Sequence, residues 1–149
     1  MKKVKRLLAL CLACMLMLSA MAIPASAADT QDEYLTLNMY RTDYTSMRRK
    51  GNNTAIYIKN QEYTLPYNGY YVKTQYGATQ TAATIYAASY GPYRFNTYSP
   101  RVIRSNATSK NLTGYWVRIR GDYKDTTYDG GWVEIAWSPD TAGTYPSLN

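Results

Sequence analysis

The sequence predicts an all-β protein, a small single-domain antiparallel β-sandwich of six to eight short strands preceded by a signal peptide. The chain holds 17 tyrosines and three tryptophans, and aromatic and β-branched residues favour strands. Several short segments alternate apolar and polar residues with a period of two between turn-forming residues. Long helical segments, which a parallel sheet needs for its crossovers, are not evident.

The first 27 residues have the three parts of a cleavable signal peptide. Four basic residues come before an uncharged apolar stretch, Leu7 to Leu18, and the segment ends on Ala25-Ser26-Ala27. The alternative is a retained membrane anchor, but the apolar stretch is shorter than the roughly 20 residues that span a bilayer. We therefore predict cleavage between Ala27 and Ala28 and a secreted, extracellular bacterial protein.

Cleavage would change the chemistry of the chain that remains. Both cysteines, Cys11 and Cys14, lie in the leader and the sequence has no histidine, so the 122 mature residues carry neither a thiol nor an imidazole. Disulfides, zinc sites built on these residues and most hydrolase mechanisms are thereby excluded. The net charge falls from +7 to +3, a weak indication of nucleic acid binding. We expect no cofactor, no enzymatic activity, no nucleic acid partner and no stable membrane insertion.

The predicted elements run in order from a flexible N-terminus at 28–33 through a sandwich domain at 34–138. A turn is expected at 66–69, which contains a proline and a glycine. Segment 82–90 is compatible with either a strand or a short helix, and Gly91-Pro92 ends it. The tail, 139–149, carries two prolines and a glycine and is expected to be irregular. The expected strands are 34–40, 54–59, 70–76, 101–104, 112–120 and 132–137.

The last two strands are expected to form an antiparallel hairpin joined by the polar loop 121–131. Alternation along both strands places apolar residues on one face and charged residues on the other. Because burying a charge is costly, the charged face should point outward. This outward face would hold Trp116, Arg118, Arg120, Trp132 and Glu134.

This expected face is the leading ligand-binding hypothesis. Trp and Arg are enriched at binding hot spots, and aromatic platforms also hold sugar rings. The alternative is that the five residues form cross-strand pairs that stabilise the sheet by about 0.2–1 kcal/mol each. The sequence thus favours a non-enzymatic protein that binds a glycan or cell-envelope polymer. A bacteriocin-like antagonistic or signalling factor is the competing hypothesis.

Arg48, Arg49 and Lys50 form the one compact basic cluster after the leader. Such a cluster could contact anionic polymers or lipid head groups. A solvated basic loop is the alternative, because membrane attachment usually needs longer basic runs.

Two sets of carboxylates suggest further chemistry. Asp122, Asp125 and Asp129 lie within eight residues and could offer oxygen ligands to calcium, although their spacing differs from that of an EF-hand loop. Glu62 and Glu134 could serve a small glycosidase or lyase, which needs two carboxylates about 5 to 9.5 Å apart. The alternatives are a polar hairpin loop for the aspartates and ordinary solvated charges for the glutamates.

Overall fold

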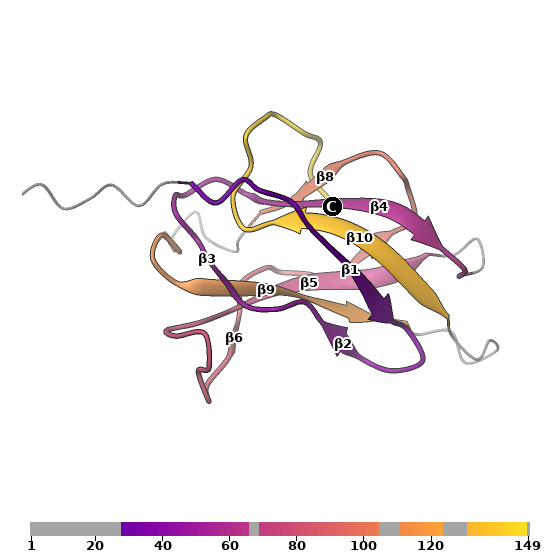
Figure 1. The fold of residues 1–149 in the computed structure, drawn as a ribbon, viewed down its shortest axis with the longest axis horizontal. Coiled ribbons are helices and arrows are strands. Elements are labelled where there is room, and N and C mark those ends of the chain that lie inside the picture. Colours follow the sequence, from indigo (N-terminus) through magenta and orange to yellow (C-terminus); the bar gives the residue numbers. More distant parts are fainter. Residues whose placement is uncertain (1–27, 66–68, 105–110, 124–130, 149) are drawn as a thin grey trace, which may run out of the picture.

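The computed structural model describes residues 28–65, 69–104, 111–123 and 131–148. These residues form ten strands and no helix, and the strands pair antiparallel in two sheets that lie face to face (Figure 1). The predicted all-β sandwich is confirmed. The described part of the chain has no helix that could cross a membrane. The predicted signal peptide and residues 66–68 of the predicted turn lie outside the described residues.

The first sheet, sheet A, is built around the last strand of the chain. A β-bulge between Glu134 and Ile135 shifts the register of that strand against β4. The order of sheet A is β1 (Glu33–Asn38), β10 (Trp132–Ser138), β4 (Ile56–Tyr63) and β8 (Arg101–Ile103). The N-terminal strand thus pairs directly with the C-terminal strand.

The second sheet, sheet B, is built around a central antiparallel pair, β5 (Tyr70–Gly77) and β9 (Trp116–Asp122). Short strands extend both edges of this pair. On β9 lie β2 (Asp43–Tyr44) and β3 (Arg48–Arg49), and on β5 lie β6 (Tyr86–Ala87) and β7 (Tyr93–Phe95).

The predicted hairpin of 112–120 with 132–137 is wrong. β9 pairs with β5, β2 and β3 in sheet B, whereas β10 pairs with β1 and β4 in sheet A. The chain therefore passes from one layer to the other between Asp122 and Trp132. Alternation predicts which face of a strand is buried, but not which strand lies next to it. Both β9 and β10 bury an apolar face, and two such faces can lie opposite each other across a core as well as side by side in one sheet.

The other predicted strands agree with the structure to within a few residues. Segment 82–90 contains the two-residue strand β6, so it is not a helix. The strands β2, β3 and β7 were not expected, because two or three residues are too short to show an alternating pattern. The tail holds no strand among its described residues, but Leu148 is buried and its backbone N–H donates to the Val102 carbonyl at 2.9 Å.

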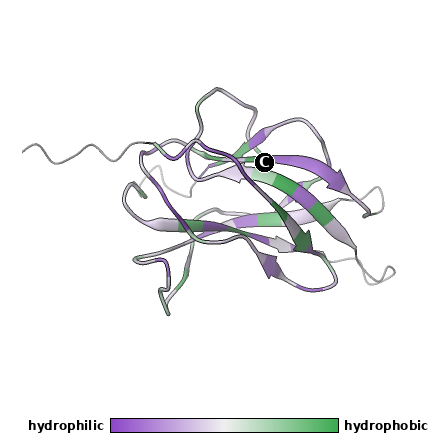
Figure 2. Cartoon of the chain, viewed as in Figure 1, coloured by the Kyte–Doolittle hydropathy of each residue, from purple (hydrophilic) through white to green (hydrophobic). Residues whose placement is uncertain are grey.

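The hydrophobic core lies between the two sheets. Alternate residues of each long strand point into it, which gives the banded hydropathy pattern along the strands in Figure 2. Gly121 allows a close approach of the layers, since a Cβ there would lie 2.6 Å from the terminal methyl of Met39. Fully buried core side chains include Leu37, Ile58, Val72, Phe95, Val117, Ile119, Val133, Ile135 and Trp137.

One polar chain crosses this core. The Tyr70 hydroxyl donates to Asn60 Oδ1 at 2.7 Å, and Asn60 Nδ2 donates to the Thr97 carbonyl at 2.9 Å. Complete burial raises the pKa of Tyr70 well above its usual value, so the hydroxyl stays protonated and remains a donor. The first bond connects β5 of sheet B with β4 of sheet A, and the second connects β4 with the segment between β7 and β8.

Tyr70→Phe should lower the free energy of unfolding by about 1–3 kcal/mol, because it leaves the buried side-chain oxygen of Asn60 without its donor. Urea unfolding measures this value. The control is Tyr34→Phe, at a side chain that is 63% exposed, which should change stability by less than about 0.5 kcal/mol. Equal losses in the two variants would contradict the assigned role of the hydroxyl.

Candidate functional site

A buried carboxylate, Asp140, joins three distant parts of the chain. It follows β10 and is fully buried. Its Oδ1 accepts hydrogen bonds from Lys50 Nζ at 2.8 Å and from the Asn52 N–H at 3.3 Å. Its Oδ2 accepts from the N–H groups of Asp29 at 2.8 Å and Gly51 at 2.7 Å. The N-terminal segment, the turn after β3 and the C-terminal segment are therefore held at one point.

The partner of Asp140 in this ion pair is also buried. The Lys50 ammonium donates to the Pro139 carbonyl at 2.5 Å as well as to the carboxylate. Burial lowers the pKa of Lys50, and the hydrogen bond and charge of Asp140 oppose that shift. Because charges removed from water must be well satisfied, this dense set of bonds is what allows the pair to be buried.

The predicted basic patch of Arg48, Arg49 and Lys50 is wrong, because only Arg49 is exposed. Arg48 Nη2 contacts the Asp29 carboxylate at 2.5 Å, and its guanidinium lies 5.4 Å from the centroid of the Trp137 ring. Lys50 is buried, and its ammonium forms the ion pair with Asp140. The sequence also predicts a flexible segment at 28–33, but these contacts hold its start against β3 and β10.

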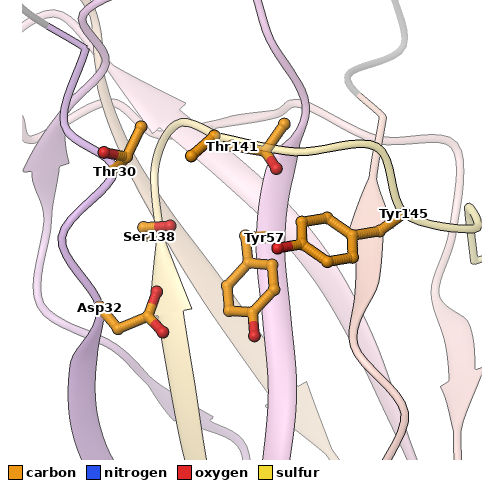
Figure 3. Close-up of a pocket in the computed structure, with 7 residues that line it drawn as sticks. Thr30, Asp32, Tyr57, Ser138, Thr141 and Tyr145 are labelled. Atoms are coloured by element: carbon orange, nitrogen blue, oxygen red, sulfur yellow. The ribbon is translucent and has the colours of Figure 1, made fainter.

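A pocket of about 260 Å³ lies on the outer face of sheet A, between the two terminal segments (Figure 3). The N-terminal segment contributes one wall, and the C-terminal segment contributes the other. Strands β4 and β10 form its floor. The lining residues are Thr30, Asp32, Tyr57, Ser138, Thr141, Ala142 and Tyr145.

Two half-buried tyrosines give this pocket an aromatic surface. The ring centroids of Tyr57 and Tyr145 are 5.1 Å apart, and the ring planes are tilted by 56°. The hydroxyl end of Tyr145 points toward Tyr57, and Asp32 lies on the other side of the Tyr57 ring (Figure 3). Burial, followed by the negative charge of Asp32, raises the pKa of Tyr57, so its hydroxyl is neutral at physiological pH.

The polar groups of the pocket are one carboxyl and several hydroxyls. Burial raises the pKa of Asp32, while the Ser138 hydroxyl and the charges of Arg48 and Lys59 counteract that rise. The Ser138 hydroxyl donates to the Asp140 carbonyl at 2.8 Å, which links the floor of the pocket to the buried ion pair. The arrangement can accept and donate hydrogen bonds around a small ligand with an apolar face.

The five residues of the predicted binding face do not lie together. Trp116, Arg118 and Arg120 point outward from sheet B, and Trp132 and Glu134 point outward from sheet A. The prediction of one shared binding face is therefore wrong, because it depends on the predicted hairpin, which does not form. Each half now belongs to a separate face of the sandwich.

The two glutamates of the glycosidase hypothesis are neighbours. Glu134 on β10 lies directly opposite Glu62 on β4, and both point outward. Neither lines the pocket.

The predicted calcium site is described only in part, because Asp125 and Asp129 lie outside the described residues. Asp122 Oδ1 accepts hydrogen bonds from Thr42 at 2.5 Å and from Arg120 at 2.8 Å. No group of three or more His, Cys, Asp or Glu side chains suited to a metal occurs among the residues that the structure describes.

The sequence does not predict the pocket. Its walls come from segments expected to be flexible or irregular, and the hydrogen bond from the Asp29 N–H to the Asp140 carboxylate joins residues 111 positions apart. No local pattern connects Asp32 with Tyr145. The polar and aromatic composition of both segments is the one available signal, and it does not indicate that they meet.

Comparison with known proteins identifies the family of the chain. The family described as "Protein of unknown function (DUF2712)" matches residues 21–141, which is most of the chain, so the protein belongs to this family. The matched range includes both members of the buried ion pair and ends before Tyr145. No curated protein and no solved structure matches the chain.

Lys50→Met should lower the free energy of unfolding by about 3–5 kcal/mol, because it leaves the Asp140 carboxylate buried without its countercharge. Chemical denaturation measures the loss. Arg49→Met, at the exposed neighbouring position, is the matched control and should change stability by less than about 0.5 kcal/mol. If the two variants are equally stable, Lys50 does not have this structural role.

Asp32→Asn should gain stability relative to the wild type as the pH rises. Below its ordinary pKa of 3.8 the Asp32 carboxyl is neutral in both the folded and unfolded states. Above that value, its raised pKa means that ionisation costs the folded state more than the unfolded state, whereas asparagine stays neutral. Melting temperatures across about pH 3 to 7 should show the difference, variant minus wild type, becoming more positive. A difference that stays constant or falls would contradict the raised pKa.

Proposed function

We propose that this DUF2712 protein is a secreted, non-enzymatic binding protein that holds a glycan of the extracellular environment or cell envelope in the pocket on sheet A. The observation that carries the proposal is the combination of two tyrosine rings, one carboxyl and several hydroxyls in that pocket. The predicted leader supports export.

The chemistry of the pocket suits a sugar ring. A sugar has an apolar C–H face and a rim of hydroxyl groups. Tyr57 and Tyr145 offer aromatic surface to the C–H face, and the two oxygens of Asp32 accept hydrogen bonds from neighbouring ligand hydroxyls. Thr30 and Thr141 can both donate and accept.

The size of the pocket limits how much of a glycan it can hold. Its volume of about 260 Å³ is just below the range of roughly 300–1,000 Å³ that is usual for small-molecule sites. It therefore suits a single sugar unit, such as a chain end or a branch, with the remainder of the glycan outside.

The pocket is better suited to binding than to hydrolysis. Among its lining residues Asp32 is the one carboxylic acid, whereas glycoside hydrolysis usually needs two carboxyl groups about 5–9.5 Å apart. The N-terminal wall is anchored to Asp140 through Asp29, and the floor is anchored to it through Ser138. A site anchored in this way loses little conformational freedom when a ligand binds.

Isothermal titration calorimetry of the mature protein with neutral tetrasaccharides (cellotetraose, chitotetraose and maltotetraose) tests the proposal. We expect at least one to bind. Asp32→Asn should weaken that binding by about 10- to 150-fold, because a hydrogen bond to a charged group contributes about 1.5–3 kcal/mol. Tyr145→Ala should also weaken it, because it removes one ring of the aromatic surface.

The control variant is Tyr90→Ala, at a tyrosine that is 79% exposed and lies outside the pocket, between β6 and β7. Its affinity should equal that of the wild type. The proposal is wrong if no tetrasaccharide binds the folded protein, or if Tyr90→Ala weakens binding as much as the two pocket variants do.

A further inference from the structure

The outer face of sheet B carries a row of cations. Along β9 the buried Val117 and Ile119 alternate with outward-facing residues, and β5 alternates in the same way. In register, Arg120 lies opposite Lys73. The cations that belong to outward positions of this sheet are Arg49, Lys73, Arg94, Arg118 and Arg120, and the aromatic residues among them are Tyr44, Tyr71 and Trp116. We call these eight residues the basic face.

The described part of the chain supplies the basic face with few negative charges. Among the described residues, Asp122 is the one acidic side chain on an outward position of sheet B, and its Oδ1 accepts from Arg120 Nε at 3.0 Å and Nη2 at 2.8 Å. Burial tends to raise the pKa of Asp122, but the Thr42 and Arg120 hydrogen bonds and the charges of Arg120 and Lys73 lower it overall. Among the described residues, Asp122 is thus the one carboxylate on the outward positions that hold Arg49, Lys73, Arg118 and Arg120.

The arrangement of these charges also lowers the stability of the fold. Arg120 and Lys73 are directly opposite each other on neighbouring strands, and like charges in that position destabilise a sheet. The Asp122 carboxylate bonds to the arginine, so the lysine charge is left without a described ion-pair partner. A ligand with negative charge would remove this repulsion.

A second cation of the basic face is held in a fixed orientation. Arg118 Nε donates to Gln75 Oε1 at 2.9 Å, and its guanidinium lies 4.1 Å from the centroid of the Tyr44 ring. Its terminal Nη groups donate to no residue in the described part of the chain. A guanidinium held in this way offers its remaining N–H groups to a planar or tetrahedral oxyanion with little loss of entropy.

We propose that the basic face binds a linear phosphodiester polymer, a polyol phosphate or sugar phosphate, that lies across β9 and β5. Outward residues repeat about every 6.5–7 Å along a strand, and adjacent strands are about 4.8 Å apart. Such a repeating array matches a chain of phosphates better than a single anion. Arginine supplies four of the five cations and is the side chain best matched to phosphate. This face is in the opposite layer from the glycan pocket, so it is an independent site.

The experiment measures binding of the mature protein to poly(glycerol phosphate) of defined length over a range of salt concentrations. We expect affinity to fall steeply with salt, because binding to a polyphosphate releases its counterions. Lys73→Gln and Arg118→Gln should each weaken binding by about fivefold and reduce the slope of log K against log salt by about 1. Asp32→Asn, in the glycan pocket, should bind the polymer as the wild type does.

The matched control is Lys59→Gln, which removes a half-buried lysine from the outer face of sheet A. Its polymer affinity should be unchanged. Lys73→Gln should change the melting temperature little, because it removes both the repulsion with Arg120 and the attraction to Asp122. Weaker binding by that variant would then not be a consequence of unfolding.

Several results would overturn the proposal. One is unchanged affinity in both basic-face variants, and another is an equal loss in Lys59→Gln. If alginate, a carboxylate polymer, binds more tightly than poly(glycerol phosphate), the assigned ligand class is wrong. If the protein instead self-associates at low salt through Lys73 and Arg118 and binds no polymer, the occupant of the face is a second copy.

Discussion

The buried ion pair between Lys50 and Asp140 is the constraint on which the positions of the N-terminal and C-terminal segments depend. Both side chains are almost entirely removed from water, so the fold must provide donors and an acceptor for them. It does so with backbone groups of the N-terminal segment, the turn after β3 and the segment after β10. The same bonds hold the N-terminal segment beside the start of the C-terminal segment, and these two segments form the walls of one pocket. The proposed glycan site is thus a consequence of how one pair of charges is satisfied.

The two-layer architecture separates two kinds of surface chemistry. Strands that alternate with a period of two turn one side chain inward and the next outward, so each sheet presents its own outer face. Sheet A exposes tyrosines with Asp32, Glu62 and Glu134, whereas sheet B exposes arginines with aromatic residues. The modest net charge of residues 28–149 therefore conceals an asymmetry between the two faces. The two proposed sites lie on opposite faces, so occupation of one would leave the other accessible.

Prediction from the sequence succeeded where the controlling interactions are local. The inward faces of the long strands were predicted correctly, because Val117, Ile119, Val133 and Ile135 reveal their burial through alternation alone. The prediction of strand pairing failed, since a strand shows the same alternation whichever strand it pairs with. The hairpin and the shared platform of Trp116 with Trp132 were both wrong for this reason. The pocket was missed because its walls are distant in sequence and lack regular structure.

The amino-acid sequence by itself determined the all-β class, the approximate strand positions and the absence of thiol and imidazole chemistry after residue 27, because composition and period-two alternation act over a few residues. Only the tertiary structure decided that β9 and β10 belong to different layers, that Lys50 is buried and that Asp32, Tyr57 and Tyr145 line one pocket. These arrangements depend on contacts between residues far apart in the chain. The free energy of such contacts comes from burial and from satisfying buried charges in three dimensions, which no short stretch of sequence contains.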